Sequence, residues 1–328
     1  MAFTFFEKFR RVTASTTYLP EIDGLRFLAV FWVAIIMHAT HYIDEKFYNN
    51  QLIQEWPWKK IVLEGVSGMN LFFMISGFIL SLPFAKAYLK GEDAVNLKRY
   101  YLRRLTRLEP PYIIALFLFF LAHVFVVKKI ALSQLVPSLF ASLIYSHELI
   151  YGYHSLVLPV AWSLEIEVQF YILAPLFCLM FTVRPVLLRR LILVLSILVS
   201  LLCAAFVKQP LSVFLLLHYF IAGLLLADFY VSRNKSVSGS IKGYILGVVL
   251  LIALLSIPSY YSLLLQFFKV SLLFAVFYLV LFYARMKAMF STKGITLIGG
   301  MCYSIYLLHF GIISGFGTLL LSRIKGFD

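Results

Sequence analysis

Two side chains that can move protons lie inside strongly apolar stretches of this sequence. His38 follows the apolar run from Phe27 to Met37, and Glu167 lies at the entry of the apolar run in LPVAWSLEIEVQFYILAPLF. An ionisable group at membrane depth is unfavourable unless it faces a protein interior or a wet cavity, so it marks a functional site by default. A neutral imidazole can take a proton from a hydroxyl or carry an acyl group, and a carboxylate can orient it. The alternative is that His38 is a hydrogen-bonded packing residue.

Arginines provide a second chemistry, the binding of anions. Arg26 precedes the apolar run that leads to His38, and LKRYYLRRLTRLEPPY places Arg104 and Arg107 three positions apart. Residues at that spacing share one helix face, and the rigid fork of arginine suits phosphate groups. Arg104 and Arg107 are therefore candidates for clamping one anionic ligand. The alternative is that this basic stretch sets the topology and contacts anionic lipid headgroups.

The overall composition places these residues in a membrane protein. The 328 residues are 62% hydrophobic and only 13% charged, and the mean hydropathy is +0.91, whereas a soluble domain has roughly 25% charged residues. The net charge of +14 therefore does not indicate nucleic acid, because basic residues of membrane proteins collect in cytoplasmic loops. The sequence has no Cys or His cluster with metal-site spacing, so we expect no metal.

Nine segments fulfil the rule that a membrane span needs about 20 mostly apolar residues. They lie near residues 26–43, 66–85, 109–127, 162–183, 187–206, 211–231, 241–257, 265–284 and 296–320. The gaps between them are too short for a soluble domain, so we predict a single domain over residues 1–328.

The segment 133–150 is apolar but broken by Pro137, and it is either a short tenth crossing or a re-entrant segment. With a cytoplasmic N-terminus, the re-entrant arrangement places 20 of the 29 Lys and Arg residues on the cytoplasmic side, and a crossing places 15 there. The positive-inside bias therefore favours the re-entrant arrangement.

Five segments, taken in order, resemble the acyltransferase-3 family of integral membrane acyltransferases, often O-acetyltransferases of bacterial surface glycans. They are EIDGLR with a histidine later in the same helix, GMNLFFMISGF, RRLTRLEPPY, WSLEIEVQFY and GGMCYSIYLLH. Each segment is weak evidence singly, but five in the family's order are specific. The likeness covers nearly the whole length of the chain.

The resemblance implies an all-α bundle of about ten transmembrane helices in the plasma membrane, the inner membrane of a bacterium. It implies an acyltransferase that moves an acyl group, commonly acetyl, from acyl-CoA to a hydroxyl of a glycan or glycolipid. O-acetylation of a surface polysaccharide or lipopolysaccharide is one such reaction. Acetyl-CoA is then a co-substrate and no cofactor is bound permanently. The partners are membrane lipid and a glycan or lipid-linked sugar acceptor.

The resemblance also implies expected roles for individual residues of the five segments. His38 and Glu167 are the expected catalytic residues, and Arg26, Arg104 and Arg107 are expected to bind the donor. The expected residues of the acceptor side and the pocket are Asn70, Ser76, Trp162, Tyr303, Tyr306 and His309.

Three departures from the family pattern bear on these roles. Eleven residues separate Arg26 from His38, where the family has ten. In a regular helix this change turns the two side chains from about 20° apart to about 120° apart. Either Arg26 precedes the regular helix or a bulge restores the face. Asn70 replaces the usual Asp, and the sequence ends soon after YLLH, where the family fold usually has one more helix.

Two other classes of function remain open from the sequence. A non-catalytic carrier or flippase for glycans or lipid-linked sugars would also need polar residues within the membrane and basic loops. An inert structural subunit explains the hydrophobicity but not the clustered polar residues. Turnover of acyl-CoA by the purified protein would separate the enzyme from both.

Overall fold

The protein is an all-helical bundle. The computed structural model describes residues 18–47, 64–206, 212–233, 240–256 and 262–323, and no strand occurs in these ranges. The α-helices are α2 Pro20–Phe31, α3 Thr40–Phe47, α6 Ser67–Lys90, α7 Leu97–Ala122, α8 Leu132–Leu143, α9 His147–Tyr151, α10 Trp162–Cys178, α11 Val186–Phe206, α12 Val213–Ser232, α13 Ile241–Ser256, α14 Leu263–Phe282, α15 Ala284–Phe290, α16 Lys293–Gly300 and α17 Cys302–Arg323. The shorter segments are the π-helices η1 Trp32–Ala39 and η3 His123–Val127 and the 3-10 helices η2 Glu64–Val66, η4 Pro159–Ala161 and η5 Leu179–Thr182.

The chain is an integral membrane protein. Within the described ranges, seven helices are long and apolar enough to cross a membrane, or eight if the bent pair α16–α17 forms one span. The all-α class predicted from the sequence is therefore confirmed, and the predicted count of nine to ten is a little higher than the seven to eight found among the described residues. The main difference is α13, whose 16 residues fall short of a full span. The basic residues that precede the first span, Lys8, Arg10 and Arg11, lie outside the described residues.

The main helix of the segment 133–150 is too short to cross a membrane by itself. This helix, α8, has 12 residues, which reach about 18 Å against a hydrocarbon core of roughly 30 Å. The Tyr101 hydroxyl near the start of α7 donates to the Ile172 carbonyl of α10, and the Tyr112 hydroxyl further along α7 donates to the Ser142 carbonyl of α8. Thus α8 and α10 follow one another along α7 and together form one return path, which agrees with the re-entrant interpretation.

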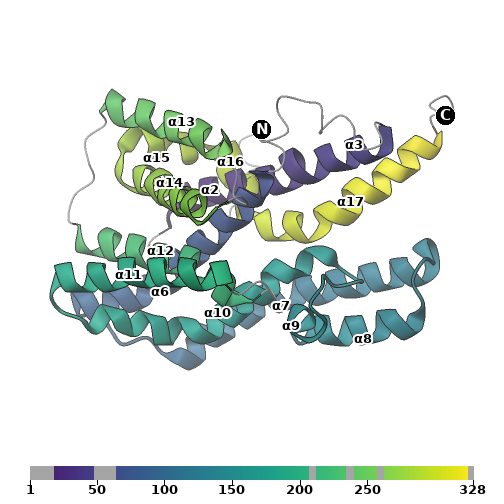
Figure 1. The fold of residues 1–328 in the computed structure, drawn as a ribbon, viewed down its shortest axis with the longest axis horizontal. Helices are drawn as coiled ribbons and strands as arrows, with labels where there is room; N and C mark the ends of the chain where they lie inside the picture. The colour runs from purple at the N-terminus through teal and green to yellow at the C-terminus, as the bar shows by residue number, and fades with distance from the viewer. Residues whose placement is uncertain (1–17, 48–63, 207–211, 234–239, 257–261, 324–328) are drawn as a thin grey trace, which may run out of the picture.

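Helices α3 and α17 are far apart in the sequence but run in parallel (Figure 1). Figure 1 shows α3 and α17 side by side, and the Tyr42 hydroxyl of α3 lies 3.0 Å from the Thr318 hydroxyl of α17. Between α2 and α3 the helix widens into the π-helix η1, which contains His38. A π-helix accommodates an extra residue within an otherwise continuous helix, so the bulge anticipated from the eleven-residue spacing is present. Arg26 lies within α2, which excludes the other explanation of that spacing.

Glycines allow the central helices to approach closely. A Cβ atom on Gly77 of α6 would meet the backbone of Phe220 on α12, and one on Gly223 of α12 would meet the backbone of Met74 and Phe78 on α6. Gly77 is the glycine near the end of the GMNLFFMISGF segment, so that segment serves close helix packing here. This contact fixes α6, which carries Ser76 toward the site described below.

Buried ion pairs connect helices at the end of the bundle where α7 begins. Asp228 of α12 accepts hydrogen bonds from Arg189 at 2.5 Å and Arg190 at 2.6 Å, both on α11. Glu21 of α2 lies 2.9 Å from the ammonium of Lys287 on α15. A buried charge is tolerated only when it is paired. These charged residues therefore hold helices together, and we assign them no role in catalysis.

Candidate active site

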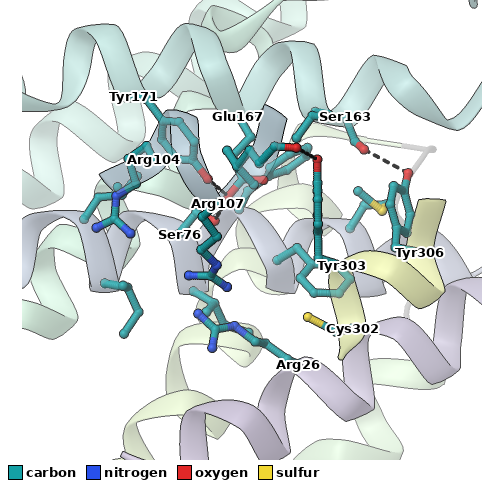
Figure 2. Close-up of a pocket in the computed structure, with 18 residues that line it drawn as sticks. Arg26, Ser76, Arg104, Arg107, Ser163, Glu167, Tyr171, Cys302, Tyr303 and Tyr306 are labelled. Carbon is teal, nitrogen blue, oxygen red and sulfur yellow. Dashed lines mark hydrogen bonds between the residues drawn. The ribbon is translucent and has the colours of Figure 1, made fainter. Parts of the chain in front are cut away.

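Two connected cavities bring together most of the polar residues that the sequence singled out. The outer cavity has a volume of about 1070 Å³ and the inner one about 80 Å³. Arg26, Ile79, Arg104 and Arg107 line both, so the wide outer cavity leads into the narrow inner one. Figure 2 shows the inner cavity between α2, α6, α7, α10 and α17.

The junction of the two cavities is rich in positive charge. In Figure 2 Arg26 and Arg107 point toward one another across the cavity, and Arg104 lies beside them. Arg26 is only 9% exposed and forms an ion pair of 2.6 Å with Asp23. Arg104 and Arg107 have no ion-pair partner among the described residues. Like charges held this close repel one another at low dielectric, so the junction favours a bound anion.

The outer cavity extends this positive field toward the end of the bundle. Its lining adds Lys86, Arg99 and Arg103 from α6 and α7, opposed by Asp23, Glu92 and Asp93. The wall therefore carries six basic and three acidic side chains, counted together with the three arginines at the junction. A surface of this kind attracts an extended anionic ligand.

The carboxylate of Glu167 lies in the inner cavity and is held by two hydroxyls. The Ser76 hydroxyl of α6 donates to Glu167 Oε1 at 2.5 Å, and the Tyr171 hydroxyl, one turn along α10, donates to the same oxygen. Ser76, Glu167 and Tyr171 all line the cavity. Both hydrogen bonds end on Oε1. The other oxygen, Oε2, has no hydrogen-bond partner among the described residues, so Oε2 can accept a proton or a hydrogen bond from a ligand.

Three residues from α10 and α17 close the far end of the inner cavity. The Tyr306 hydroxyl lies 2.8 Å from the Ser163 hydroxyl and donates to the Val160 carbonyl at 3.0 Å. The Tyr303 hydroxyl donates to the Leu108 carbonyl of α7 at 2.9 Å. These bonds fix both tyrosines as a wall, as Figure 2 shows.

His38 lies beyond this wall rather than in the cavity. Its ring is 5.2 Å from that of His309 and stacks on Phe310 at 4.7 Å, and its Nε2 lies 3.5 Å from the Ser314 hydroxyl. All three neighbours are on α17, the helix whose Cys302 lines the cavity together with Arg26. The π-helix thus restores the common face of Arg26 and His38, and both face α17.

The structure does not bring His38 and Glu167 into contact. The described hydrogen bonds of the Glu167 carboxylate go to Ser76 and Tyr171, and Tyr306 stands on the path toward the imidazole. No described hydrogen bond joins Glu167 to His38, so the expected orientation of His38 by Glu167 stays a prediction. Glu167 of α10 packs against α6, whereas the described contacts of the His38 ring are with α17, a difference that helix spacing alone does not reveal.

The other predicted pocket residues divide into two groups. Ser76, Tyr303 and Tyr306 line the inner cavity, whereas Asn70, Trp162 and His309 do not. Asn70 is buried within α6, and Trp162 packs on Phe73 with ring centroids 6.2 Å apart. His309 is buried against His38 behind Tyr306.

Sequence reasoning missed several residues of the site and a second polar cluster. Tyr171 lies four positions after Glu167, one helical turn, and Ser163 directly follows Trp162 in WSLEIEVQFY, which was the available signal. The cluster around Glu148 and His154 lies in the break before α10, outside the five segments. The run Ser146–Glu148, which ends an apolar segment with three polar residues, could have indicated it.

Comparison with known proteins supplies the family context. A family model described as an acyltransferase domain, Acyl_transf_3, matches residues 19–325. Peptidoglycan O-acetyltransferase OatA of Listeria monocytogenes is 29% identical over 182 residues, 52% of this chain and 26% of that protein. O-acetyltransferase OatA of Staphylococcus aureus strain NCTC 8325 is 29% identical over 171 residues, 49% of this chain and 25% of that protein. A putative O-acetyltransferase of Staphylococcus aureus strain COL is 28% identical over 167 residues, 48% of this chain and 24% of that protein.

The matched part thus spans about a quarter of the length of these curated relatives. No solved structure matches the chain.

Proposed function

The chain belongs to the acyltransferase-3 family, and we propose that it transfers an acyl group, acetyl in the simplest case, from acyl-CoA to a hydroxyl of a surface glycan or glycolipid. The observation that carries the proposal is the position of Arg104 and Arg107. Both side chains line the junction of the two cavities and have no ion-pair partner among the described residues, and the inner cavity beyond them contains Glu167. Coenzyme A combines phosphate groups with a narrow pantetheine arm. A wide basic cavity that narrows to a polar end suits that shape.

In this proposal the arginines bind the donor and take no part in proton transfer. Arg104 and Arg107 pair with phosphate oxygens, for which the guanidinium fork is suited. Arg26, already paired with Asp23, adds charge at the neck of the cavity. The pantetheine arm then runs through the inner cavity toward Tyr306, with the thioester near Glu167.

The chemistry requires a base and a group that supports the developing negative charge. The acceptor hydroxyl attacks the thioester carbonyl, the C–S bond breaks, and the proton of the hydroxyl ends on the thiol of coenzyme A. We assign to His38 the role of base or of transient acyl carrier. Because Tyr306 separates His38 from the cavity, the tyrosine side chain must turn aside for the acyl group to reach the imidazole.

Glu167 has a different role from the orientation of His38. Its carboxylate, held by Ser76 and Tyr171, lies beside the proposed path of the thioester. It can accept a hydrogen bond from the amide groups of the pantetheine arm or hold a proton during the transfer. Acyl-CoA is a co-substrate in this scheme, and we propose no permanently bound cofactor.

The proposed orientation places the N-terminus and the basic cavity on the cytoplasmic side of a bacterial inner membrane. The support is the excess of Lys and Arg on that side in the re-entrant topology. A glycan acceptor is supported by the name of the Listeria relative, a peptidoglycan O-acetyltransferase, of which this chain matches about a quarter. A polysaccharide or lipopolysaccharide acceptor remains within the same chemical class.

The test is turnover of acetyl-CoA by the purified full chain. Release of free thiol should require a glycan acceptor, and mass spectrometry should show one added acetyl group per thiol released. Surface glycans from cells with and without the protein should differ by the same mass. If acetyl-CoA neither binds nor turns over, the enzyme proposal fails, and movement of labelled glycan lipid across proteoliposomes then tests the carrier alternative.

A further inference from the structure

The return path beside α7 is interrupted in the middle of the bundle. The return path begins with α8 and ends with α10. The break between these two helices contains α9, an irregular stretch over residues 152–158, and η4. The Tyr145 hydroxyl in this interruption donates to Glu109 at 3.2 Å, near the middle of the span Leu97–Val127. Irregular backbone at membrane depth is tolerated only where it is buried in protein or lines a water-filled space.

Buried polar groups fix the inner side of this break. The Nδ1–H of His147 donates to the Tyr153 carbonyl at 3.0 Å, which leaves Nε2 to accept from the Ser138 hydroxyl at 2.9 Å. The same Ser138 oxygen accepts the Leu156 N–H at 3.1 Å. His147 is fully buried and all these groups are satisfied, so they hold the loop in one conformation and are not accessible to a substrate.

The outer side of the break presents an imidazole that a carboxylate holds in place. The Nδ1–H of His154 donates to Glu148, whose side chain is 4% exposed, while the His154 side chain is 56% exposed. The Glu148 backbone is itself fixed by a hydrogen bond of 3.0 Å to Glu165. When the ring carries its single proton on Nδ1, Nε2 is an acceptor, and Nε2 has no hydrogen-bond partner among the described residues.

Aromatic rings surround this imidazole. The His154 ring stacks on Trp162 with centroids 6.0 Å apart and 23° between the planes. Tyr151 and Tyr153 are 39% and 48% exposed on the same short loop. A sugar ring has apolar faces and a rim of hydroxyls, so its binding sites combine aromatic faces with a few placed hydrogen-bonding groups.

The break is separated from the inner cavity by one layer of side chains. Trp162 packs on Phe73, and the next residue, Ser163, bonds to Tyr306. Phe73, Ser163 and Tyr306 all line the cavity that we assign to the donor. A group bound at His154 therefore lies on the opposite side of that wall from the donor.

We propose that this break is the acceptor site, in which a carbohydrate hydroxyl donates a hydrogen bond to His154 Nε2 and the sugar ring rests on Trp162. Glu148 acts as a positioning residue, because its carboxylate keeps the proton on Nδ1 and the lone pair on Nε2 directed outward. The proposal rests on the proposed function, since it places the second substrate of the same reaction. A lipid chain would make no use of a paired imidazole and carboxylate, and this favours a carbohydrate.

The test compares the KM values of the two substrates in the purified full chain. Acetyl-CoA is held at saturation while chitotriose or maltotriose is varied, and then the reverse. His154→Gln and Glu148→Gln should raise the KM for the oligosaccharide about tenfold, the effect of losing one well-placed hydrogen bond. The KM for acetyl-CoA should move much less, a split that partial unfolding would not produce. Trp162→Phe, which keeps an aromatic ring, should raise the oligosaccharide KM by a smaller factor.

The matched control is His123→Gln, which replaces a half-buried imidazole in η3, the π-helix that follows α7. It should leave both KM values unchanged. If wild-type protein fails to bind acetyl-CoA, the proposed function fails as a whole. If it binds and transfers acetyl normally but all three variants keep the wild-type oligosaccharide KM, only the acceptor site is wrong. Transfer to glycerol but to neither oligosaccharide would also overturn it. If the two Gln variants do not fold, Trp162→Phe decides.

Discussion

Ser76 of α6 donates a hydrogen bond of 2.5 Å to Glu167 of α10, although the two residues are 91 positions apart in the chain. The contact joins two of the segments that the sequence singled out separately and places a carboxylate in the inner cavity. The two residues therefore have different expected effects on activity. Glu167 supplies the carboxylate that faces the cavity, and Ser76 only holds that carboxylate in place.

We expect Glu167→Gln to lower kcat for acyl transfer about a hundredfold, within the range for loss of a proton-transfer group. Ser76→Ala should lower it only about fivefold, since it removes one hydrogen bond and leaves Tyr171 to hold the carboxylate. The measurement is thiol release from acetyl-CoA, with Glu45→Gln, a change at an exposed residue of α3, as the control. Equal losses in both cavity variants would show that Glu167 serves packing alone.

Arg104 and Arg107 should act on donor binding rather than on chemistry. Replacing both by Ala should raise the KM for acyl-CoA by about tenfold to a hundredfold, as expected for losing charge-assisted hydrogen bonds. The effect on kcat should be smaller. Replacement by Lys should rescue only in part, because a point charge cannot reproduce the guanidinium fork. Lys129→Ala, beyond the far end of α7, is the control, and unchanged acyl-CoA binding in the double Ala variant would contradict the assignment.

His38 should be essential and His41 dispensable. We expect His38→Ala to insert and fold normally yet to lose acyl transfer about a thousandfold, the range for removal of a catalytic base. His41→Ala on α3 should keep most of the activity. The measurement is turnover normalised to folded protein. The opposite result would identify His41 as the working imidazole, and full activity in both variants would favour the carrier.

The loops before α7 and after α10 should lie on the same side of the membrane. The test is labelling of single cysteines at Asp93 and Leu187, both exposed, with a third at Lys129 beyond the far end of α7. Asp93 is preferable to the neighbouring Gly91, whose φ of 73° disfavours a side chain. Asp93 and Leu187 should react from one side and Lys129 from the other. Reaction of the first two from opposite sides would mean that 133–150 crosses the membrane.

An added methyl group at the contact between α6 and α12 should destabilise the protein. Gly223→Ala would place a Cβ against the backbone of Met74 and Phe78, which cannot move aside easily. We expect a loss of about 1–3 kcal/mol of stability, typical of overpacking, read as a lower Tm in detergent. Gly294→Ala is the control, because nothing lies within 4 Å of its Cβ position. A Tm unchanged by Gly223→Ala would show that the two helices can separate at little cost.

The sequence by itself determined the class of the molecule and most of its helices. Long apolar runs must form hydrogen-bonded helices in a membrane, because no water is present there to satisfy the backbone. That rule depends only on local composition. It also explains the slightly lower count of spans among the described residues, where α13 is apolar but has only 16 residues. The spacing of Arg26 and His38 even anticipated a bulge, because helical periodicity is a local property.

Only the tertiary structure decided which polar residues share a site. Ser76, Glu167 and Tyr171 meet because α6 and α10 pack at one particular depth and rotation, and no pattern within either helix specifies that contact. The same packing places Glu167 in the inner cavity and His38 against α17, although the sequence analysis expected both to be catalytic. Side-chain direction and depth arise from the sum of many helix contacts across the whole bundle, so they become visible only when the helices are assembled.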